Sequence, residues 1–307
     1  MVRLTDIQGI LVGHAHDLKE ETGCTAIVFP QGAVAGADIR GSAPGTREAA
    51  MLQPTFMIRR IHAIMLTGGS AFGLRTADGA MRWLAEQKIG FDAQGVCIPI
   101  VPAAVLFDMN ENRDSALPTE EMGYRACQKA SKDYAEGKVG AGSGARVGKI
   151  LGLANSMPGG LASTSTLLPN GTQVSALAVV NALGDVINPA NGQIIAGARH
   201  PETNDFIDTY QHIVKTNFGQ SASGTNTTLA VVATDAAFSK EEINKIAQIA
   251  QAGITRSTRP AHTMHDGDMV FAVSCGKKKA DINVVGAIAA TLVAEAIVKA
   301  VRLTNGL

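Results

Sequence analysis

Aromatic side chains make up only 4% of this 307-residue chain, and charged side chains only 18%. The formal net charge is zero, so the chain lacks the basic excess with which proteins attract nucleic acids or anionic membrane surfaces. Its most concentrated cluster of one charge is three lysines at residues 277–279, which is typical of a solvated loop. We therefore predict no nucleic-acid partner and no membrane partner.

The sequence also lacks a recognisable targeting segment and any cysteine motif. Residues 1–6 contain neither a basic n-region nor an apolar h-region, and we expect no apolar run of membrane-spanning length. The four cysteines form no CxxC pair, and no histidine stands at ligand spacing from them. We predict reduced thiols, a cytoplasmic protein, no metal and no other cofactor. The cysteines are Cys24, Cys97, Cys127 and Cys275.

Small residues are abundant, with 33 glycines, and they permit close approach of sheet and helix layers. Apolar periodicity predicts strands at residues 9–12, 23–29, 32–38, 61–67, 150–153, 160–167, 173–181, 229–234 and 269–274. It predicts helices at 74–87, 120–135, 240–253 and 283–301, the third opened by a capping box at Ser239. Hairpin turns are expected at residues 30–32 and 169–171. The pattern indicates one α+β domain over residues 1–307, with stacked sheets.

The most informative segment for function is Gly-Thr-Asn-Thr-Thr at residues 224–228, which leads directly into the apolar run at 229–233. A hydroxyl residue at the entry to a buried strand is where an N-terminal-nucleophile hydrolase cuts its own chain. The hydroxyl attacks the preceding carbonyl, and the freed α-amine, which titrates near ~7.7–8.0 in model peptides, becomes its base. An ordinary Ser/Thr-rich loop has the same composition, so the interpretation needs support from other segments.

Two glycine-rich segments match known motifs only in part. Residues 68–73 depart from the nucleophile elbow G-x-S-x-G because Phe72 stands at the second glycine. A backbone anion site at a helix N-terminus and tight strand-to-helix packing both remain open there. Residues 140–149 depart from the phosphate loop, since Ser143 stands in place of a glycine and Ile150 in place of the magnesium-binding hydroxyl.

Charged residues in apolar surroundings are the remaining candidates. Lys149 is either a surface lysine or a partly buried ammonium that binds a carbonyl oxygen or lowers the pKa of a neighbouring amine. Asp266 and Asp268 flank a glycine, which usually marks a turn, although such a pair can also bind a metal or orient an ammonium group. The seven histidines are dispersed and indicate no Ser–His–Asp triad.

Taken in order, these segments resemble the self-cleaving aminopeptidase and β-aminopeptidase family of the L-aminopeptidase/D-esterase type, which includes nylon-oligomer (6-aminohexanoate-oligomer) hydrolases. The resemblance covers nearly the whole chain and is sharpest at residues 226–228, 231–235 and 262–273. It implies a four-layer αββα sandwich of the N-terminal-nucleophile, ornithine-acetyltransferase type. It also implies cleavage between Asn226 and Thr227 into pieces 1–226 and 227–307, and a homo-oligomer of four or more subunits.

The same resemblance implies the roles of the site residues. Thr227, which the family's strand register selects over Thr228, is the nucleophile and carries its own α-amine base. Asn181 is the oxyanion donor, and Lys149 lies beside the nucleophile. The carboxylates near the free amine are Asp266 and Asp268, and the residues that we place at the substrate are Gly69, Ser70 and Phe107.

One position departs from the family pattern. Aminopeptidase members often carry a tyrosine in a Tyr-Asp pair, whose hydroxyl assists the oxyanion, whereas this chain has Phe107 before Asp108. We expect hydrolysis of amide bonds in short amine-bearing substrates through an acyl-enzyme on Thr227. These substrates are peptide N-termini, amino-acid amides, β-peptides and 6-aminohexanoate oligomers. A self-cleaving acyltransferase and an uncleaved, non-catalytic binding protein are the alternatives.

Overall fold

The computed structural model describes residues 2–109, 117–216 and 226–307, and most of its strands join one large sheet. Nine strands pair in the order β10-β11-β14-β16-β2-β4-β7-β3, and β1 pairs with β2 outside this path. These strands are β1 (Leu11–Asp17), β2 (Thr22–Ile39), β3 (Thr46–Arg47), β4 (Arg60–Thr67), β7 (Ala103–Val105), β10 (Gly160–Leu167), β11 (Gln173–Asn181), β14 (Thr227–Ala236) and β16 (Met269–Lys278).

Short strands and five α-helices complete the fold within the described ranges. The helices are α1 (Thr76–Glu86), α2 (Glu120–Gln128), α3 (Thr209–Thr216), α4 (Lys240–Ser257) and α5 (Ile282–Asn305). The short pairings are β5 (Phe91–Ala93) with β6 (Val96–Ile98), β8 (Arg146–Val147) with β9 (Met157–Pro158), and β12 (Asp185–Ile187) with both β13 (Ile194–Ala196) and β15 (Thr258–Arg259).

The sheet bends at β2 so that its two halves face one another. The N-terminal half of β2 pairs with β1 and the C-terminal half with β16, while its pairing with β4 shifts register between Val28 and Ala33. In β14, Ala230 and Val232 pack with α4 and α5, whereas Leu229, on the other face, packs into a cluster between the two sheet halves. A third cluster joins β2 and β4 to α1 and α2.

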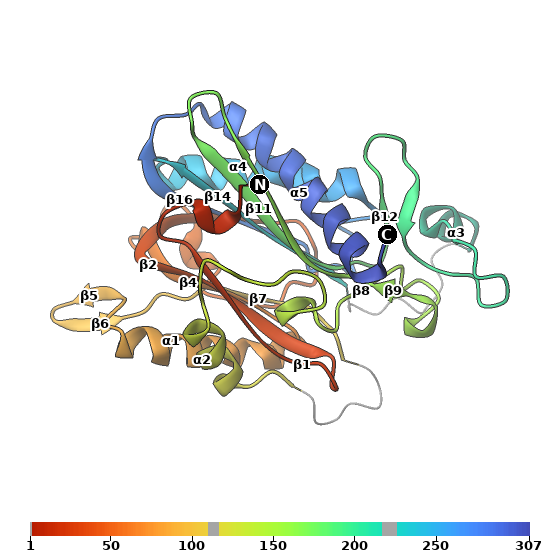
Figure 1. Ribbon diagram of the computed structural model, residues 1–307, viewed down its shortest axis with the longest axis horizontal. Helices are drawn as coiled ribbons and strands as arrows, with labels where there is room; N and C mark the ends of the chain where they lie inside the picture. The colour runs from red at the N-terminus through yellow and green to blue at the C-terminus, as the bar shows by residue number, and fades with distance from the viewer. Residues whose placement is uncertain (1, 110–116, 217–225) are drawn as a thin grey trace.

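Four layers therefore lie in the order helices, sheet, sheet, helices. Figure 1 shows α4 and α5 on one side of the molecule and α1 and α2 on the opposite side, with the strands between them. Both faces of each sheet half are buried, one against helices and the other against the opposite sheet half. Successive apolar residues along a strand therefore pack alternately into these two interfaces. The predicted four-layer αββα architecture is confirmed.

Several predicted elements agree closely with the structure. Strands β10 and β11 have the predicted bounds, and the turn between them includes Gly171 at φ +77°. The predicted capping box opens α4: the N–H of Glu242 donates to Ser239 Oγ, and the N–H of Ser239 donates to the Glu242 carboxylate over 2.8 Å.

One predicted turn, one predicted strand and the C-terminal ends of two predicted helices were wrong. No hairpin forms at residues 30–32, because β2 continues through them and the register shift absorbs the irregularity. Residues 150–153 form a turn and the start of a short 3-10 helix rather than a strand, and α2 ends at Gln128 instead of residue 135. Helix α4 runs past Gly253 to Ser257. Gly253 serves packing rather than helix termination, since a Cβ there would lie 2.3 Å from the carbonyl oxygen of Ala290 in α5.

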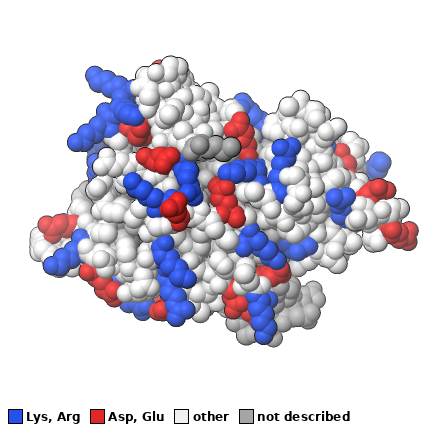
Figure 2. All heavy atoms as spheres, viewed as in Figure 1, with Lys and Arg blue, Asp and Glu red and all other residues white. Residues whose placement is uncertain are grey.

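Helix α5 corrects one further expectation. It is long and apolar enough, by length and composition, to cross a membrane, although the sequence was expected to hold no such run. However, 61% of its most apolar window is buried inside the protein, where it packs against α4 and the sheet. A core helix passes the same test of length and composition. Figure 2 shows basic and acidic side chains interspersed over the face of the molecule that is in view.

Lys240 ties the loop before β4 to the start of α4. Its ammonium is buried and donates to three backbone carbonyl oxygens, those of Met51 (2.7 Å), Phe56 (3.0 Å) and Ile58 (2.8 Å).

We predict that Lys240→Met lowers the free energy of unfolding by about 2–4 kcal/mol, because three carbonyls lose a charged donor. Urea unfolding followed by circular dichroism measures this. Exposed Lys245 on the same helix provides the control, since Lys245→Met should change the free energy by less than about 0.5 kcal/mol. Equal effects of the two substitutions would contradict the prediction.

Candidate active site

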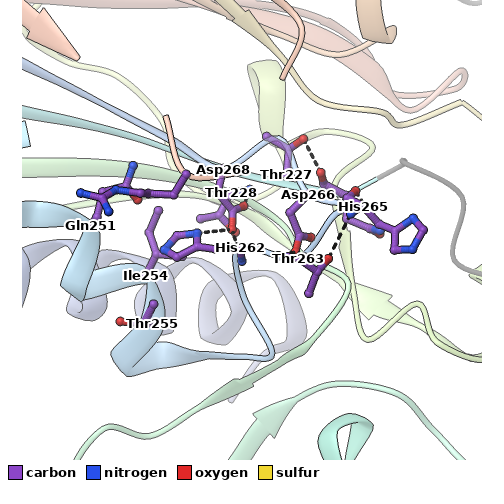
Figure 3. A network of polar contacts seen from close by, with 12 residues as sticks. Thr227, Thr228, Gln251, Ile254, Thr255, His262, Thr263, His265, Asp266 and Asp268 are labelled. Carbon is purple, nitrogen blue, oxygen red and sulfur yellow. Dashed lines mark hydrogen bonds and ion pairs between the residues drawn. The ribbon is translucent and has the colours of Figure 1, made fainter. Parts of the chain in front are cut away.

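Thr227 is the first residue of β14, and its side chain bends back on the residue before it. The Thr227 hydroxyl donates to the Asn226 carbonyl oxygen over 2.5 Å. The same oxygen accepts the backbone N–H of Gly267 over 2.8 Å, beside an isolated parallel bridge between Asn226 and Asp266. Figure 3 shows Thr227 close to Asp266 and Asp268, at the point where β14 and β16 begin. The Thr227 hydroxyl therefore lies against the carbonyl group of the peptide bond that precedes it.

Strand register places Asn181 directly opposite this threonine. The antiparallel pairing of β11 with β14 makes Asn181 and Thr227 partners. Both share the strand face of Val179 and Leu229, which lies between the sheet halves. The Asn181 side chain donates from Nδ2 to the Phe107 carbonyl oxygen over 2.9 Å and accepts at Oδ1 from the Arg146 N–H over 3.0 Å. These bonds hold the amide in one orientation next to the hydroxyl.

The second candidate hydroxyl, that of Thr228, belongs to the opposite face of the strand. Thr228 shares the face of Ala230 and Val232, which pack with α4 and α5. Its Oγ1 is buried and has no hydrogen-bond partner within the described ranges. Its backbone N–H donates to Asp268 Oδ1 over 2.6 Å. The alternation of the strand thus sends Thr227, and not Thr228, into the space between the sheet halves.

Both carboxylates are buried, each 2% exposed, and each is held by the segment that follows β15. Asp268 Oδ2 accepts the N–H of His262 over 3.0 Å and lies 2.9 Å from its Nδ1. Asp266 Oδ2 accepts the N–H (2.7 Å) and the hydroxyl (2.6 Å) of Thr263. Burial and the neighbouring Asp268 raise the pKa of Asp266, against the opposing effect of the Thr263 donors.

Lys149 is 7% exposed, and its ammonium donates to the Asn181 carbonyl oxygen over 2.9 Å. Burial lowers the pKa of Lys149 to about 7, although Asp266 and Asp108 act in the opposite direction. The preceding Gly148 has φ +71°, and a Cβ there would lie 2.0 Å from the N of Ala198, so only glycine allows this loop to approach. Burial thus weakens the preference of Lys149 for its charged form.

A cavity of about 270 Å³ opens beside Asn181. Its lining residues are Glu21, Phe107, Asp108, Gly144, Arg146, Leu153, Ala154 and Asn181. Asp108 accepts hydrogen bonds from the Thr22 hydroxyl (2.8 Å) and the Gly69 N–H (2.7 Å). Two acidic side chains thus line a cavity that reaches the proposed oxyanion donor.

The structure brings most of the sequence-predicted residues together, but not all in the same way. Asn181 pairs with Thr227 across the two strands, and Lys149 donates to the Asn181 carbonyl oxygen. Phe107 lines the cavity. The N–H of Gly69 donates to Asp108, which lines the cavity, and the N–H of Ser70 donates to the Leu106 carbonyl. Neither Gly69 nor Ser70 belongs to the cavity lining in the described part of the chain. That same part contains no group of three or more His, Cys, Asp or Glu residues placed to hold a metal ion.

Sequence reasoning assigned no role to His262, Thr263 or Gly267. The dispersed histidines indicate no triad, and the Asp-Gly-Asp unit predicts a turn, a metal-binding pair or a pair that orients an ammonium group. His262 has φ +59°, an uncommon conformation for a non-glycine residue, and it directs both its N–H and its ring to Asp268. No local pattern in the sequence indicates this contact, because it depends on how the segment folds over the strand ends.

Known proteins are similar to this chain in sequence. A family model described as peptidase family S58 matches residues 3–306. An uncharacterized aminopeptidase of Mycobacterium leprae (strain TN) is 40% identical over 304 residues, covering 91% of this chain and 80% of the relative. A 6-aminohexanoate-oligomer endohydrolase of Kocuria sp. (strain KY2) is 28% identical over 323 residues, covering 97% of this chain and 85% of the relative.

Solved structures share the fold. The L-aminopeptidase D-Ala-esterase/amidase of Ochrobactrum anthropi, described as a variant of the Ntn hydrolase fold, has a TM-score of 0.73 at 18% identity, over 98% of this chain and 86% of that one. A β-aminopeptidase of Burkholderia sp. has a TM-score of 0.66 at 20% identity, over 96% and 85%. The protein is thus a hydrolase that acts on amide bonds and has the N-terminal-nucleophile hydrolase fold. It belongs to peptidase family S58.

The depressed pKa of Lys149 predicts a specific pH dependence of stability. Between pH 7 and the ordinary value of 10.5, the unfolded chain holds a proton that the native Lys149 lacks, so the free energy of unfolding rises with pH in this window. The slope from one proton is at most about 1.4 kcal/mol per pH unit. We predict that Lys149→Met removes this contribution. Urea unfolding at pH 7.5 and 9.5, with Thr227→Ala as the background of both chains, compares the two slopes. Identical slopes with and without Lys149 would contradict a depressed pKa.

Proposed function

We propose that Thr227 is the nucleophile of a self-cleaving amidohydrolase. The observation that carries this proposal is the 2.5 Å contact of the Thr227 hydroxyl with the Asn226 carbonyl oxygen, which also accepts the Gly267 N–H. Cleavage at this peptide bond yields a piece of residues 1–226 and a piece of residues 227–307. The new α-amine of Thr227 then serves as the base for its own hydroxyl.

In the processed enzyme, Thr227 attacks the carbonyl carbon of a substrate amide and forms an acyl-enzyme, which water hydrolyses. Asn181, the strand partner of Thr227, is the proposed donor to the developing oxyanion. The short distance between the Lys149 ammonium and the Asn181 main chain supports a role for Lys149 as a positive group near that charge, in addition to the Asn181 amide. Phe107 has no hydroxyl, so we assign no oxyanion contact to its side chain.

The proposed substrates are short oligo-amides that carry a free amine. The cavity beside Asn181 supports this class, because Glu21 and Asp108 give it two acidic side chains while Arg146 provides a single positive one. A relative is named a 6-aminohexanoate-oligomer endohydrolase and another an aminopeptidase, and both names describe enzymes that cut amides of amine-bearing compounds. A protein that instead passes its acyl group to another amine would yield a new amide product when an amine acceptor is added.

We also propose that the protein forms a homo-oligomer. The hairpin of β5 and β6 stands out from the body of the protein in Figure 1. Several of its apolar side chains are exposed. These include Val96, which is 61% exposed, together with Phe91 and Ile98. Association of such arms would remove apolar surface from water. Light scattering coupled to size-exclusion chromatography measures the mass, which equals that of one chain if this proposal is wrong.

Self-cleavage is the first test of the proposed function. Purified wild-type protein should separate under denaturing conditions into two fragments, the smaller with Thr227 as its N-terminal residue. Thr227→Ala should remain one inactive chain of 307 residues, because it has no hydroxyl to attack the Asn226 carbonyl. Thr228→Ala is the matched control and should still be processed. Intact-mass measurement and N-terminal sequencing provide the readout, and an active wild type that remains uncut would rule out the mechanism.

The oxyanion role of Asn181 predicts a loss in kcat rather than in binding. In processed protein, Asn181→Asp and Asn181→Ala should each lower kcat by roughly 10²–10³, the usual effect of removing one such donor, with a much smaller change in KM. Asn181→Asp keeps the acceptor for the Arg146 N–H and so separates the donor from the structural bond. Rates are measured on amino-acid anilides and 6-aminohexanoate oligomers and are divided by the processed fraction. A kcat within a few-fold of wild type in both variants would remove Asn181 from the mechanism.

A further inference from the structure

The carbonyl group of Asn226 has a backbone donor that belongs to neither the nucleophile nor the residues assigned to substrate hydrolysis. The N–H of Gly267 lies 2.8 Å from the Asn226 oxygen, a normal hydrogen-bond length. The Thr227 hydroxyl contacts the same oxygen. Asn181 directs its Nδ2 to the Phe107 carbonyl. The donor next to the cleavage site is therefore supplied by the segment that leads into β16, the strand that pairs with β14.

We propose that the Gly267 N–H is the oxyanion donor of the self-cleavage reaction, an inference that rests on the proposed cleavage between Asn226 and Thr227. In that reaction Thr227 Oγ bonds to the Asn226 carbonyl carbon, and the carbonyl oxygen takes up negative charge, which Gly267 stabilises. The carbon–nitrogen bond then breaks, and the proton lost from Oγ is returned to the leaving nitrogen. Water hydrolyses the resulting ester to the Asn226 carboxylate and the free Thr227 hydroxyl.

The peptide group that contains this N–H is fixed from both ends. Its carbonyl, that of Asp266, accepts the N–H of Ala43 over 2.9 Å. On the other side of Gly267, the Asp268 carbonyl oxygen accepts the N–H groups of Arg40 (3.0 Å) and Gly41 (3.1 Å). The segment at residues 40–43 therefore holds the backbone of residues 266–268 in place. A donor that is already oriented needs no rearrangement when charge develops on the oxygen, and this is the condition under which such donors are most effective.

The position also requires the absence of a side chain. A Cβ on residue 267 would lie 2.7 Å from the Thr227 Oγ1 and 3.0 Å from the Ala43 carbonyl oxygen. The φ of Gly267 lies outside the left-handed region, so the requirement comes from these contacts and not from backbone strain. A methyl group at this position would push the hydroxyl away from the Asn226 carbonyl. Gly267 thus combines a donor for the oxyanion with space for the nucleophile.

The test replaces the amide nitrogen of residue 267 by oxygen, through incorporation of glycolic acid at this position during cell-free translation. This change deletes the N–H and adds no atoms that could clash. We expect the rate of self-cleavage to fall by roughly 10²–10³. The rate is measured from the appearance of the fragment that begins at Thr227. The same ester at Gly171 is the matched control, because the N–H of Gly171 also donates over 2.8 Å, to Leu168 in the β10–β11 turn. The control should be cut within threefold of the wild-type rate.

Gly267→Ala tests the second part of the inference, since it keeps the N–H and adds the methyl group. We expect it to accumulate as a folded, uncut chain with a melting curve like that of Thr227→Ala. If Gly267→Ala fails to fold, the ester experiment alone decides. A wild type that cleaves while the ester at 267 cleaves equally fast would overturn this inference and leave the proposed function intact. A wild type that never cleaves would overturn both.

Discussion

The pairing of β14 with a strand on each side is the constraint on which the rest of the site depends. Its antiparallel register with β11 sets Asn181 opposite Thr227, and its parallel register with β16 sets Asn226 beside Asp266. A shift of one residue in either register would turn Thr227 toward α4 and α5 and bring Thr228 between the sheet halves. Because apolar residues of β14 are buried on both faces, such a shift would place side chains of the wrong size in two cores at once.

Burial between the sheet halves determines the electrostatics of the site. Lys149 and the two carboxylates have almost no contact with solvent, so each depends on fixed donors and acceptors rather than on water. Asp268 is bound by His262 and by the Thr228 N–H, and Asp266 by Thr263. The same burial lowers the pKa of Lys149 toward neutrality and raises that of Asp266. Asp266 pairs with Asn226 and Lys149 binds the strand partner of Thr227, so two groups with shifted pKa values lie near the peptide bond that the Thr227 hydroxyl contacts.

Resemblance and structure contributed differently to the candidate site. The residues Thr227, Asn181, Lys149, Asp266 and Asp268 were all named from the sequence through the family resemblance, and the structure brings them to the ends of β11, β14 and β16. Gly267 was recognised only as the middle of an Asp-Gly-Asp unit. Its hydrogen bond to Asn226 joins residues 41 positions apart (267 − 226 = 41), and local periodicity carries no information on a contact of that separation.

The sequence alone determined the features that depend on neighbouring residues. The apolar run after Thr228 determined a buried strand, and Ser239 with Glu242 determined where α4 begins. Gly171 determined a turn, in which its φ is positive. Only the tertiary structure decided that β2 runs unbroken, that α4 continues past Gly253, and that the Gly267 N–H meets the Asn226 carbonyl. Helix caps and turns are satisfied within a few residues of the chain. By contrast, the length of a strand and the donors around a carbonyl depend on which distant segments pack against them.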